Sequence, residues 1–148
     1  MQSPSSPVLV DLGCGDTTPE GYLGIDLAPA ARPHVRADLR LGIPLVDDAV
    51  DTLRANDFFE HLTPLVPVFN ECWRVLRTGG RLTLAVPRFP HTDAVKDPTH
   101  VSFFVVETFT EYLCAPDWNV RLYGLRTWNL LDLTPAPHRI YAVMEPRK

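Results

Sequence analysis

The first half of the chain consists of short apolar runs that are separated by glycine, proline and acidic residues. Apolar runs of this length, bounded by turn-forming residues, predict buried strands. The runs are Val8–Leu12, Tyr22–Asp26, His34–Ala37 and Val50–Ala55, and each has a carboxylate or an amide within one residue of its C-terminal end. Because the carboxyl ends of parallel strands lie at one edge of a sheet, we expect these polar groups to gather there.

The connections between these runs are too short or too rich in proline for full helices. Ten residues separate Gly15 from Asp26, which leaves room for one helical turn capped by Thr17 or Thr18. The segment 27–34 contains two prolines, and the segment that follows it up to residue 49 contains glycine, proline and paired aspartates. We therefore expect few helices over this half of the sheet.

The second half opens with the strongest helical pattern in the chain. Apolar residues recur three and four positions apart, which predicts a helix over Pro64–Arg77 with one apolar face. Pro64 suits the first helical position, and Gly79 with Gly80 predicts the end of the helix. The remaining pattern predicts a strand, a loop, a helix and two terminal strands, at Arg81–Val86, Arg88–His100, Val105–Leu113, Asn119–Leu131 and Ile140–Met144.

Composition narrows the class of protein. The 148 residues, 45% hydrophobic and 22% charged, are typical of one globular domain. The net charge of −4 argues against nucleic acid as the main partner. Cys14, Cys72 and Cys114 lack C-x-x-C spacing, so we expect reduced thiols in a cytoplasmic protein. No segment has the length or polarity of a membrane span, so we expect no membrane partner.

The stretch Val8–Ala28, VLVDLGCGDTTPEGYLGIDLA, carries the most specific chemistry. Its glycine turn at 13–15 lets a ligand approach the backbone, and Asp26 at the next strand end can hold a ribose diol. Thr18 stands where a dinucleotide-binding fingerprint has its third glycine, and Asp11 would repel a pyrophosphate. The stretch therefore predicts a nucleoside ligand with a positively charged end.

Further motifs follow this stretch in order. They are Ala37-Asp38-Leu39 before IPLVDDAVD, then ANDFFEHL, then ECWRVLRTGGRLTLAVPR. With DLGCG and GIDL, they resemble the class I S-adenosylmethionine-dependent methyltransferases, in a small type 11-like form, over about Val8–Arg88 and more weakly through DPTHVSFF. The resemblance implies an α/β fold: a Rossmann-like, mainly parallel sheet with a C-terminal antiparallel β-hairpin and reduced helices on one face. It also implies a single domain at 8–148 after a flexible lead-in at 1–7.

The resemblance implies S-adenosylmethionine as the cofactor. Asp11 would attract its ammonium group, Asp26 would accept from both ribose hydroxyls, and Asn56 would line the methionine portion. Asp38 would accept from the adenine amine, with the Leu39 backbone beside the ring.

The expected cofactor contacts also include Gly13, Cys14, Gly15 and Leu27. The alternatives are structural. Asp26 can be a loop cap, Asp38 a solvated turn residue and Asn56 a turn cap.

Three histidines are candidates for the base that takes a proton from the acceptor: His61, His91 and His100. His61 can instead brace the helix that follows it, together with Glu60. The spacing H-x5-D-x2-H over residues 91–100 matches no metal pattern, so we expect no metal. This loop is expected to roof the acceptor pocket.

We therefore expect methyl transfer to a small-molecule acceptor that the sequence does not identify. The alternative is a non-catalytic module that binds S-adenosylmethionine or S-adenosylhomocysteine, or an interaction module with a degenerate fold. A sheet face with few helices would expose apolar side chains, so we also expect a homo-oligomer or a partner protein that covers it. Loops and prolines cover that face in the other interpretation.

Overall fold

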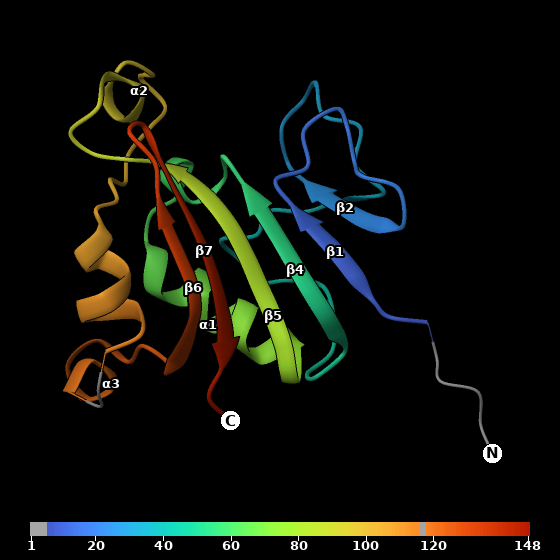
Figure 1. Ribbon diagram of the computed structural model, residues 1–148. Helices are drawn as coiled ribbons and strands as arrows, with labels where there is room; N and C mark the ends of the chain where they lie inside the picture. Colours follow the sequence, from blue (N-terminus) through green and yellow to red (C-terminus); the bar gives the residue numbers. More distant parts are fainter. Residues whose placement is uncertain (1–5, 116–117) are drawn as a thin grey trace.

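A computed structural model describes residues 6–115 and 118–148, and the residues 1–5 of the predicted lead-in lie outside these ranges. A seven-stranded sheet in the order β3-β2-β1-β4-β5-β7-β6 forms the centre of the molecule (Figure 1). The strands are β1 (Leu9–Leu12), β2 (Tyr22–Asp26), β3 (Val35–Arg36), β4 (Val50–Asn56), β5 (Leu76–Pro87), β6 (Trp128–Pro135) and β7 (Arg139–Pro146). β1 to β5 are parallel, and β7 runs antiparallel to both β5 and β6. The predicted fold class is confirmed.

The segment between β1 and β2 lies flat on the sheet. The helical turn predicted after Thr17 or Thr18 is wrong, because residues 17–19 have no regular secondary structure and only turns flank them. Gly24 in β2 explains the difference: a Cβ there would lie 2.2 Å from the Thr18 hydroxyl and 2.8 Å from the Cys14 sulfur. Because Gly24 has no side chain, the side chains of Thr18 and Cys14 pack directly against β2. The connection from β1 to β2 therefore needs no helix.

The helix α1 (Leu65–Val75) packs its apolar stripe on the sheet and buries Val68, Phe69 and Cys72. It ends two residues before the predicted Arg77, and β5 follows at once. The expectation that Gly79 and Gly80 stop the helix is wrong. They lie inside β5, where the register with β4 shifts, and a Cβ at Gly80 would lie 3.1 Å from the Val50 carbonyl oxygen.

The predicted strand Asn119–Leu131 is also wrong. The helix α3 (Trp118–Tyr123) takes its first part, and β6 starts only at Trp128. Gly124, with a φ of 67°, ends the helix, and Asn70 of α1 holds the next turn by donating to the Gly124 carbonyl at 2.7 Å and accepting from Arg126 N–H at 2.8 Å. The predicted loop 88–100 contains the short helix α2 (Thr92–Val95), and the predicted helix 105–113 is largely the π-helix η2 (Thr108–Leu113).

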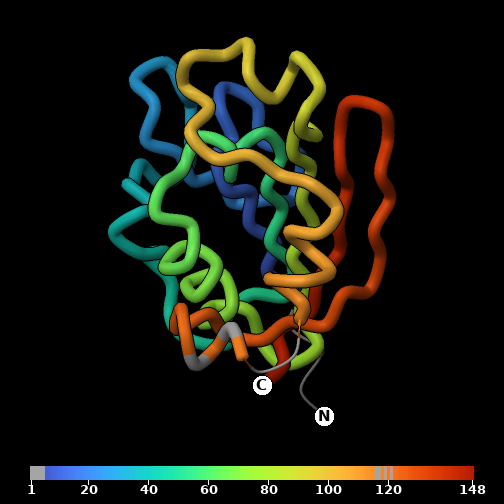
Figure 2. Tube along the Cα trace, turned by 90° about the vertical axis from the view of Figure 1, so that its left-hand side faces the viewer, coloured from blue at the N-terminus to red at the C-terminus, as the bar shows by residue number. Residues whose placement is uncertain are grey.

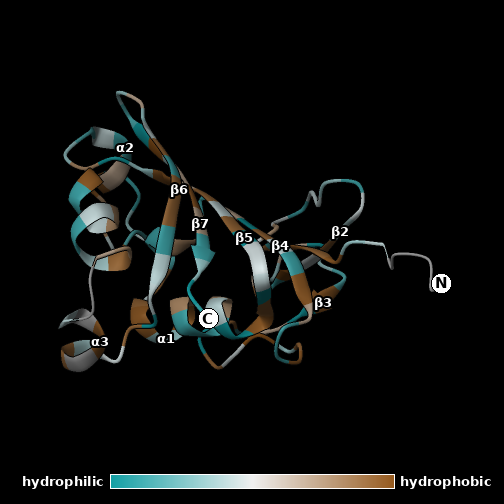
Figure 3. Ribbon diagram, turned by 60° about the horizontal axis from the view of Figure 1, so that its bottom comes forward, coloured by the Kyte–Doolittle hydropathy of each residue, from teal (hydrophilic) through white to brown (hydrophobic). Residues whose placement is uncertain are grey.

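The hydrophobic core lies between α1 and one face of the sheet, and among the described residues the other face of β1, β4 and β5 carries no helix (Figures 1 and 2). We call this second side the open face. Figure 3 shows hydrophobic and hydrophilic bands along β4 and β6. The middle of the open face is polar: Asp11, Arg54 and Thr83 are register neighbours on three adjacent strands, and Thr52 pairs with Arg81 beside them. The expectation of a largely apolar open face is therefore wrong for its centre.

Candidate functional site

A pocket of about 460 Å³ lies at the carboxyl ends of β1, β2 and β4. The arrowheads of β1, β4 and β5 in Figure 1 point to this end of the molecule. The wall of the pocket is formed by the glycine turn, the segments after β2 and after β3, and the turn after β4. The lining residues are Gly13, Gly15, Asp26, Leu27, Ala28, Ala37, Asp38, Leu39, Arg40, Asp57, Phe58, His61 and Leu62.

Asp26 joins the glycine turn to the end of β2. Its Oδ2 accepts from the Gly15 N–H at 2.8 Å, and its Oδ1 accepts from the Ala28 N–H at 2.7 Å. Gly15 can present its amide because its φ of 62° is in the left-handed region. Each carboxylate oxygen can accept a second hydrogen bond, so Asp26 is fixed in place and still able to bind a ligand hydroxyl.

The segment after β3 brings a second carboxylate to the wall. Asp38 binds Arg40 through two contacts, Nε to Oδ1 at 2.9 Å and Nη2 to Oδ2 at 2.7 Å. The hydrogen bonds from Arg40 hold the pKa of Asp38 below its ordinary value, so this carboxylate is ionised at neutral pH. Arg40 lines the pocket and is not among the predicted site residues.

The turn after β4 contributes two residues to the pocket wall that are not among the predicted site residues. Phe58 lies directly against Gly13, where a Cβ would be 2.4 Å from the ring. Asp57 has a φ of 49° and accepts from Arg139 at 2.6 Å, whereas the predicted Asn56 ends β4 and does not line the pocket. In the sequence, the end of the apolar run indicates that polar residues of this segment lie near the pocket. The position of the turn then decides whether Asn56 or Asp57 faces it.

Two further predicted site residues, Asp11 and Cys14, are buried and do not line the pocket. Asp11 is 1% exposed, and its Oδ1 accepts from Arg54 Nη1 at 2.7 Å. Burial raises the pKa of Asp11 and the Arg54 contact opposes that rise. The Cys14 side chain is buried towards Gly24. Of the twelve predicted site residues, the pocket therefore brings together seven: Gly13, Gly15, Asp26, Leu27, Asp38, Leu39 and His61.

The three predicted histidines occupy different places. His61 is in the 3₁₀ helix η1 (Phe59–His61) and lines the pocket. His100 lies next to it with ring centroids 4.7 Å apart, although it does not line the pocket. His91 is half-exposed, and its Nδ1 accepts from the Asp93 N–H at 3.1 Å at the start of α2.

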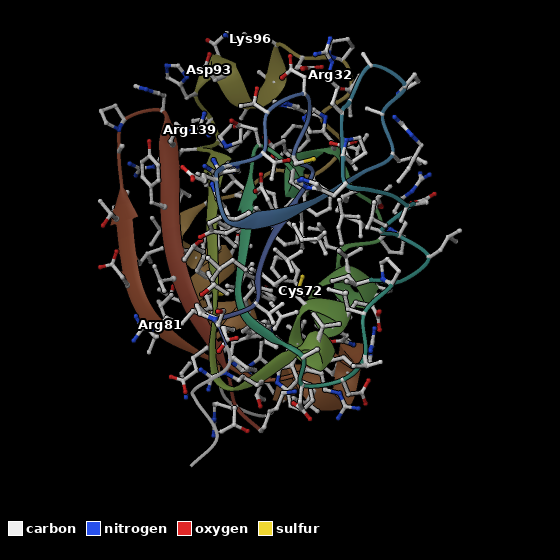
Figure 4. All side chains as sticks on the ribbon, turned by 90° about the vertical axis from the view of Figure 1, so that its right-hand side faces the viewer. Arg32, Cys72, Arg81, Asp93, Lys96 and Arg139 are labelled. Carbon is white, nitrogen blue, oxygen red and sulfur yellow. The ribbon has the colours of Figure 1, made fainter. Side chains whose placement is uncertain are left out.

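The loop 88–100 lies at the pocket end of the molecule. Figure 4 shows Asp93 and Lys96 of this loop there, together with Arg32 of the segment after β2. None of the described residues 88–100 lines the pocket, so the expected roof is not seen in this structure. The loop instead supports His61, because Thr99 lies 2.9 Å from the His61 Nδ1.

Comparison with known proteins relates the chain to methyltransferases. A family model described as a methyltransferase domain matches residues 10–84. A probable S-adenosylmethionine-dependent methyltransferase from Mycolicibacterium smegmatis is 31% identical over 130 residues, which cover 71% of this chain and 49% of the relative. This chain thus spans about half the length of that relative.

Two solved structures share the fold. One is a chain from the complex between the Haloferax volcanii Trm112 methyltransferase activator and a methyltransferase, with a TM-score of 0.68 and 16% identity over 96% of this chain and 83% of that one. The other is the [4+2]-cyclase SpnF, with a TM-score of 0.70 and 14% identity over 95% of this chain and 74% of that one. Among the described residues, no helix is both long and apolar enough to cross a membrane.

Proposed function

Because the chain belongs to the class I S-adenosylmethionine-dependent methyltransferases, we propose that it transfers the methyl group of S-adenosylmethionine to a small-molecule acceptor. The observation that carries this proposal is the pocket of about 460 Å³ whose wall joins the glycine turn to Asp26 and Asp38. Its volume is within the range of roughly 300–1,000 Å³ that small-molecule sites have. When bound, S-adenosylmethionine supplies a methyl group on a positively charged sulfur, which is already electrophilic.

The polar groups of the wall support an assignment for the nucleoside end. Asp26 is held by two backbone amides and keeps acceptor capacity for the ribose hydroxyls. Asp38 and the backbone of Leu39 follow it along the wall and suit the adenine. Leu27 adds apolar contact between these two places.

The glycine turn supports an assignment for the methionine end. A Cβ at Gly15 would meet nothing within 4 Å, so the backbone there borders open space. Asp11, Cys14 and Asn56 adjoin this part of the wall from behind, and we assign them to holding the turn and the end of β4. The negative charge of Asp11 is paired with Arg54. We therefore assign binding of the ammonium group of S-adenosylmethionine to backbone carbonyls and water.

His61 is the predicted base that best suits the acceptor end, because it is the one that lines the pocket. The task of the chain is to position donor and acceptor and to exclude water, which requires no nucleophile of its own. The His100 ring lies against the His61 ring, and His91, which caps the start of α2, does not line the pocket.

A binding module without turnover is the second candidate. The described residues between β1 and β2 and between β2 and β3 form no helix, so the cofactor has less cover than a full crossover would give. The fold itself does not decide between the two candidates, because one fold hosts different functions. Production of S-adenosylhomocysteine with any member of an acceptor library separates the two candidates.

Calorimetric titration with S-adenosylhomocysteine tests the pocket assignment. Asp26→Asn keeps the size of the side chain but removes its charge and one acceptor, so binding should weaken by about 10- to 100-fold. Asp16→Asn is the matched control, since Asp16 is an exposed aspartate next to the glycine turn that does not line the pocket. Equal affinity of wild type and Asp26→Asn would remove Asp26 from the site.

We also propose a partner on the open face, either a second copy of the chain or another protein. The absence of a helix there in the described residues supports it, as does the likeness to a chain of an activator complex. Because the centre of this face is polar, such a partner has to bring polar groups to Arg54 and Arg81. A cytoplasmic location is proposed as well, on the basis of the free cysteines 14, 72 and 114.

A further inference from the structure

Three metal-ligating side chains meet beside the pocket, outside the residues assigned to the cofactor. They are Glu60 and His61 of η1 and His100 of the loop before η2. Their ligand atoms all lie within 4.8 Å of one another. The spacing of residues 91–100 predicts no metal, whereas the fold brings His100 next to His61 of a distant segment.

Glu60 is buried without a partner for its charge. The residue is 1% exposed, and neither carboxylate oxygen has a hydrogen bond among the described residues. Its backbone carbonyl is fixed, because it accepts from the N–H groups of Val101 at 2.8 Å and Ser102 at 3.1 Å. A buried carboxylate that lacks a partner is costly, and a cation in contact with it would remove that cost.

Burial raises the pKa of Glu60 to about 7. The backbone N–H of Glu60 itself opposes this rise, although it does not reach hydrogen-bond geometry to either carboxylate oxygen; Asp57 raises the pKa further, and His100 and Arg139 lower it. Arg139, labelled in Figure 4, is bound to Asp57 at 2.6 Å and makes no hydrogen bond to Glu60. The surrounding charges therefore leave the Glu60 oxygens available.

In both His61 and His100, the Nδ1 atom is engaged in a hydrogen bond. The His100 Nδ1 is 3.0 Å from the Ala94 carbonyl oxygen, which can only accept, so this nitrogen carries the hydrogen. The His61 Nδ1 is 2.9 Å from the Thr99 hydroxyl, whose own hydrogen goes to Asp97 at 2.7 Å. The Thr99 oxygen therefore accepts from His61, and with the hydrogen on Nδ1 the Nε2 of each ring is the nitrogen that can offer a lone pair to an ion.

This is the arrangement that metal-binding histidines show. A ligating imidazole usually donates its second N–H to a carbonyl, a carboxylate or a bridging group, which fixes the ring and its tautomer. The Asp97 Oδ2 is 3.7 Å from the His100 Nε2, which is beyond hydrogen-bond distance. One ring nitrogen of each histidine and one Glu60 oxygen lie within 4.8 Å of one another, and the Nε2 of each ring is the nitrogen that these hydrogen bonds leave available.

We propose that Glu60, His61 and His100 bind one divalent transition-metal ion of the zinc type. Two imidazoles and one carboxylate form a donor set that zinc uses when a fourth position is kept for water or substrate, whereas Mg²⁺ and Ca²⁺ prefer oxygen donors. Tetrahedral bonds of roughly 2.0–2.2 Å place donors about 3.4 Å apart, so small side-chain rotations close the site.

The position of the site assigns a class of acceptor. Because His61 lines the pocket, an ion that it holds would adjoin the pocket, and an acceptor bound there would be next to the coordination position that the chain does not fill. A metal of this type would bind an acceptor oxygen and favour its deprotonated form, with the proton lost to water, so with the ion bound the metal and not His61 would promote loss of that proton. The acceptor is therefore a hydroxyl or enol compound. This role rests on the proposed function, whereas binding of the ion does not.

The test uses the full chain, stripped with a chelator and titrated with Zn²⁺ in a calorimeter. We expect one ion per chain and a higher melting temperature with the metal, since a ligand that binds only the folded state stabilises it. Glu60→Gln and His100→Ala should each weaken binding by at least about 10-fold, which is 1.4 kcal/mol. Mg²⁺ should give no comparable binding.

His91→Ala is the matched control. It removes a histidine of the same loop and breaks the exposed pair of His91 and His138, whose rings are 5.5 Å apart. We expect it to bind Zn²⁺ as wild type does. Absence of binding in wild type, equal binding in Glu60→Gln, or loss of binding in His91→Ala would each overturn the proposal.

A second titration keeps the two proposals apart. Glu60→Gln replaces the buried acid by a neutral group of the same shape, so it should fold, and it should bind S-adenosylhomocysteine as wild type does. Loss of Zn²⁺ binding with intact S-adenosylhomocysteine binding supports the metal site. Zn²⁺ binding by a wild-type chain that fails to bind S-adenosylhomocysteine would contradict the proposed function only.

Discussion

Asp11 and Arg54 are register neighbours on β1 and β4, and the Arg54 Nη1 lies 2.7 Å from the Asp11 Oδ1. The carboxylate is buried, whereas the arginine side chain is about one-third exposed on the open face. The acidic group of the glycine-turn motif is thus neutralised by the chain itself. Its structural effect is to tie the strand before the turn to the strand that carries Asp57 and Phe58 into the pocket.

Arg54→Met should destabilise the fold, because it leaves the Asp11 carboxylate buried without its partner. Loss of one member of a buried pair costs about 3–5 kcal/mol, and we expect roughly 2–4 kcal/mol here because Arg54 is partly exposed. Urea denaturation measures the change. The double variant Asp11→Asn with Arg54→Met should recover part of the loss, and a double variant as unstable as the sum of the single variants would contradict the pairing.

The contact between Gly13 and Phe58 makes a second prediction. Gly13→Ala places a methyl group 2.4 Å from the ring at a φ of 66°, so we expect a loss of stability and weaker S-adenosylhomocysteine binding. The cost should be about 1–3 kcal/mol, which combines backbone strain with overpacking. Phe58→Leu in the same chain should relieve the steric part. A Gly13→Ala variant as stable as wild type would show that the ring does not sit there.

Glu71 predicts a pH dependence of stability. It accepts from the Ile43 N–H at 2.8 Å and from Arg74 at 2.7 Å, and the Arg74 contact lowers its pKa. A carboxylate with a lowered pKa stabilises the fold above its unfolded pKa, and the effect is lost as the pH falls through the folded pKa. Glu71→Gln should therefore cost about 1–3 kcal/mol at pH 7 and little at pH 3.

Chemical denaturation at both pH values checks this prediction. Glu107→Gln is the control, because Glu107 is an exposed glutamate of the same chain. It should leave stability unchanged at either pH. A Glu71→Gln effect that is the same size at pH 3 as at pH 7 would mean that the ionised carboxylate is not what stabilises the segment before β4.

The proposed partner surface predicts a mass in solution. If copies of the chain associate through the open face, light scattering should give a multiple of 16.6 kDa, and Arg81→Glu should lower the mass. Figure 4 shows Arg81 and the buried Cys72 on opposite sides of the sheet. Arg147→Glu, a charge reversal near the end of β7, is the control. A chain that is monomeric in solution and that also fails to bind a purified methyltransferase activator similar to Trm112 would contradict the proposed partner surface.

Most strand positions and the part of the pocket wall that contains Asp26 and Asp38 were predictable from sequence, because both depend on local patterns. Asp26 and Asp38 follow strand-like runs, and the rule for carboxyl ends of parallel strands places them together. The strand predicted at 119–131 failed because its apolar residues fit a helix followed by a strand equally well. Only Gly124 and the hydrogen bonds of Asn70 decide between these possibilities.

The surroundings of His61 were not predictable, because they depend on contacts between distant segments. An acidic residue such as Glu60 is normally exposed, and nothing local indicates that it is buried. His100 reaches His61 only because the loop before η2 folds back over η1, where Val101 and Ser102 bind the Glu60 carbonyl. The choice between Asn56 and Asp57 depends on one left-handed residue after β4.

A crystal structure of the chain with S-adenosylhomocysteine tests the central claim most directly. We predict both ribose hydroxyls within hydrogen-bond distance of the Asp26 carboxylate, the adenine beside Asp38 and Leu39, and the sulfur end over the turn of Gly13 and Gly15. A ligand bound elsewhere, or a pocket that stays empty at saturating ligand while Phe58 still covers Gly13, would contradict the account.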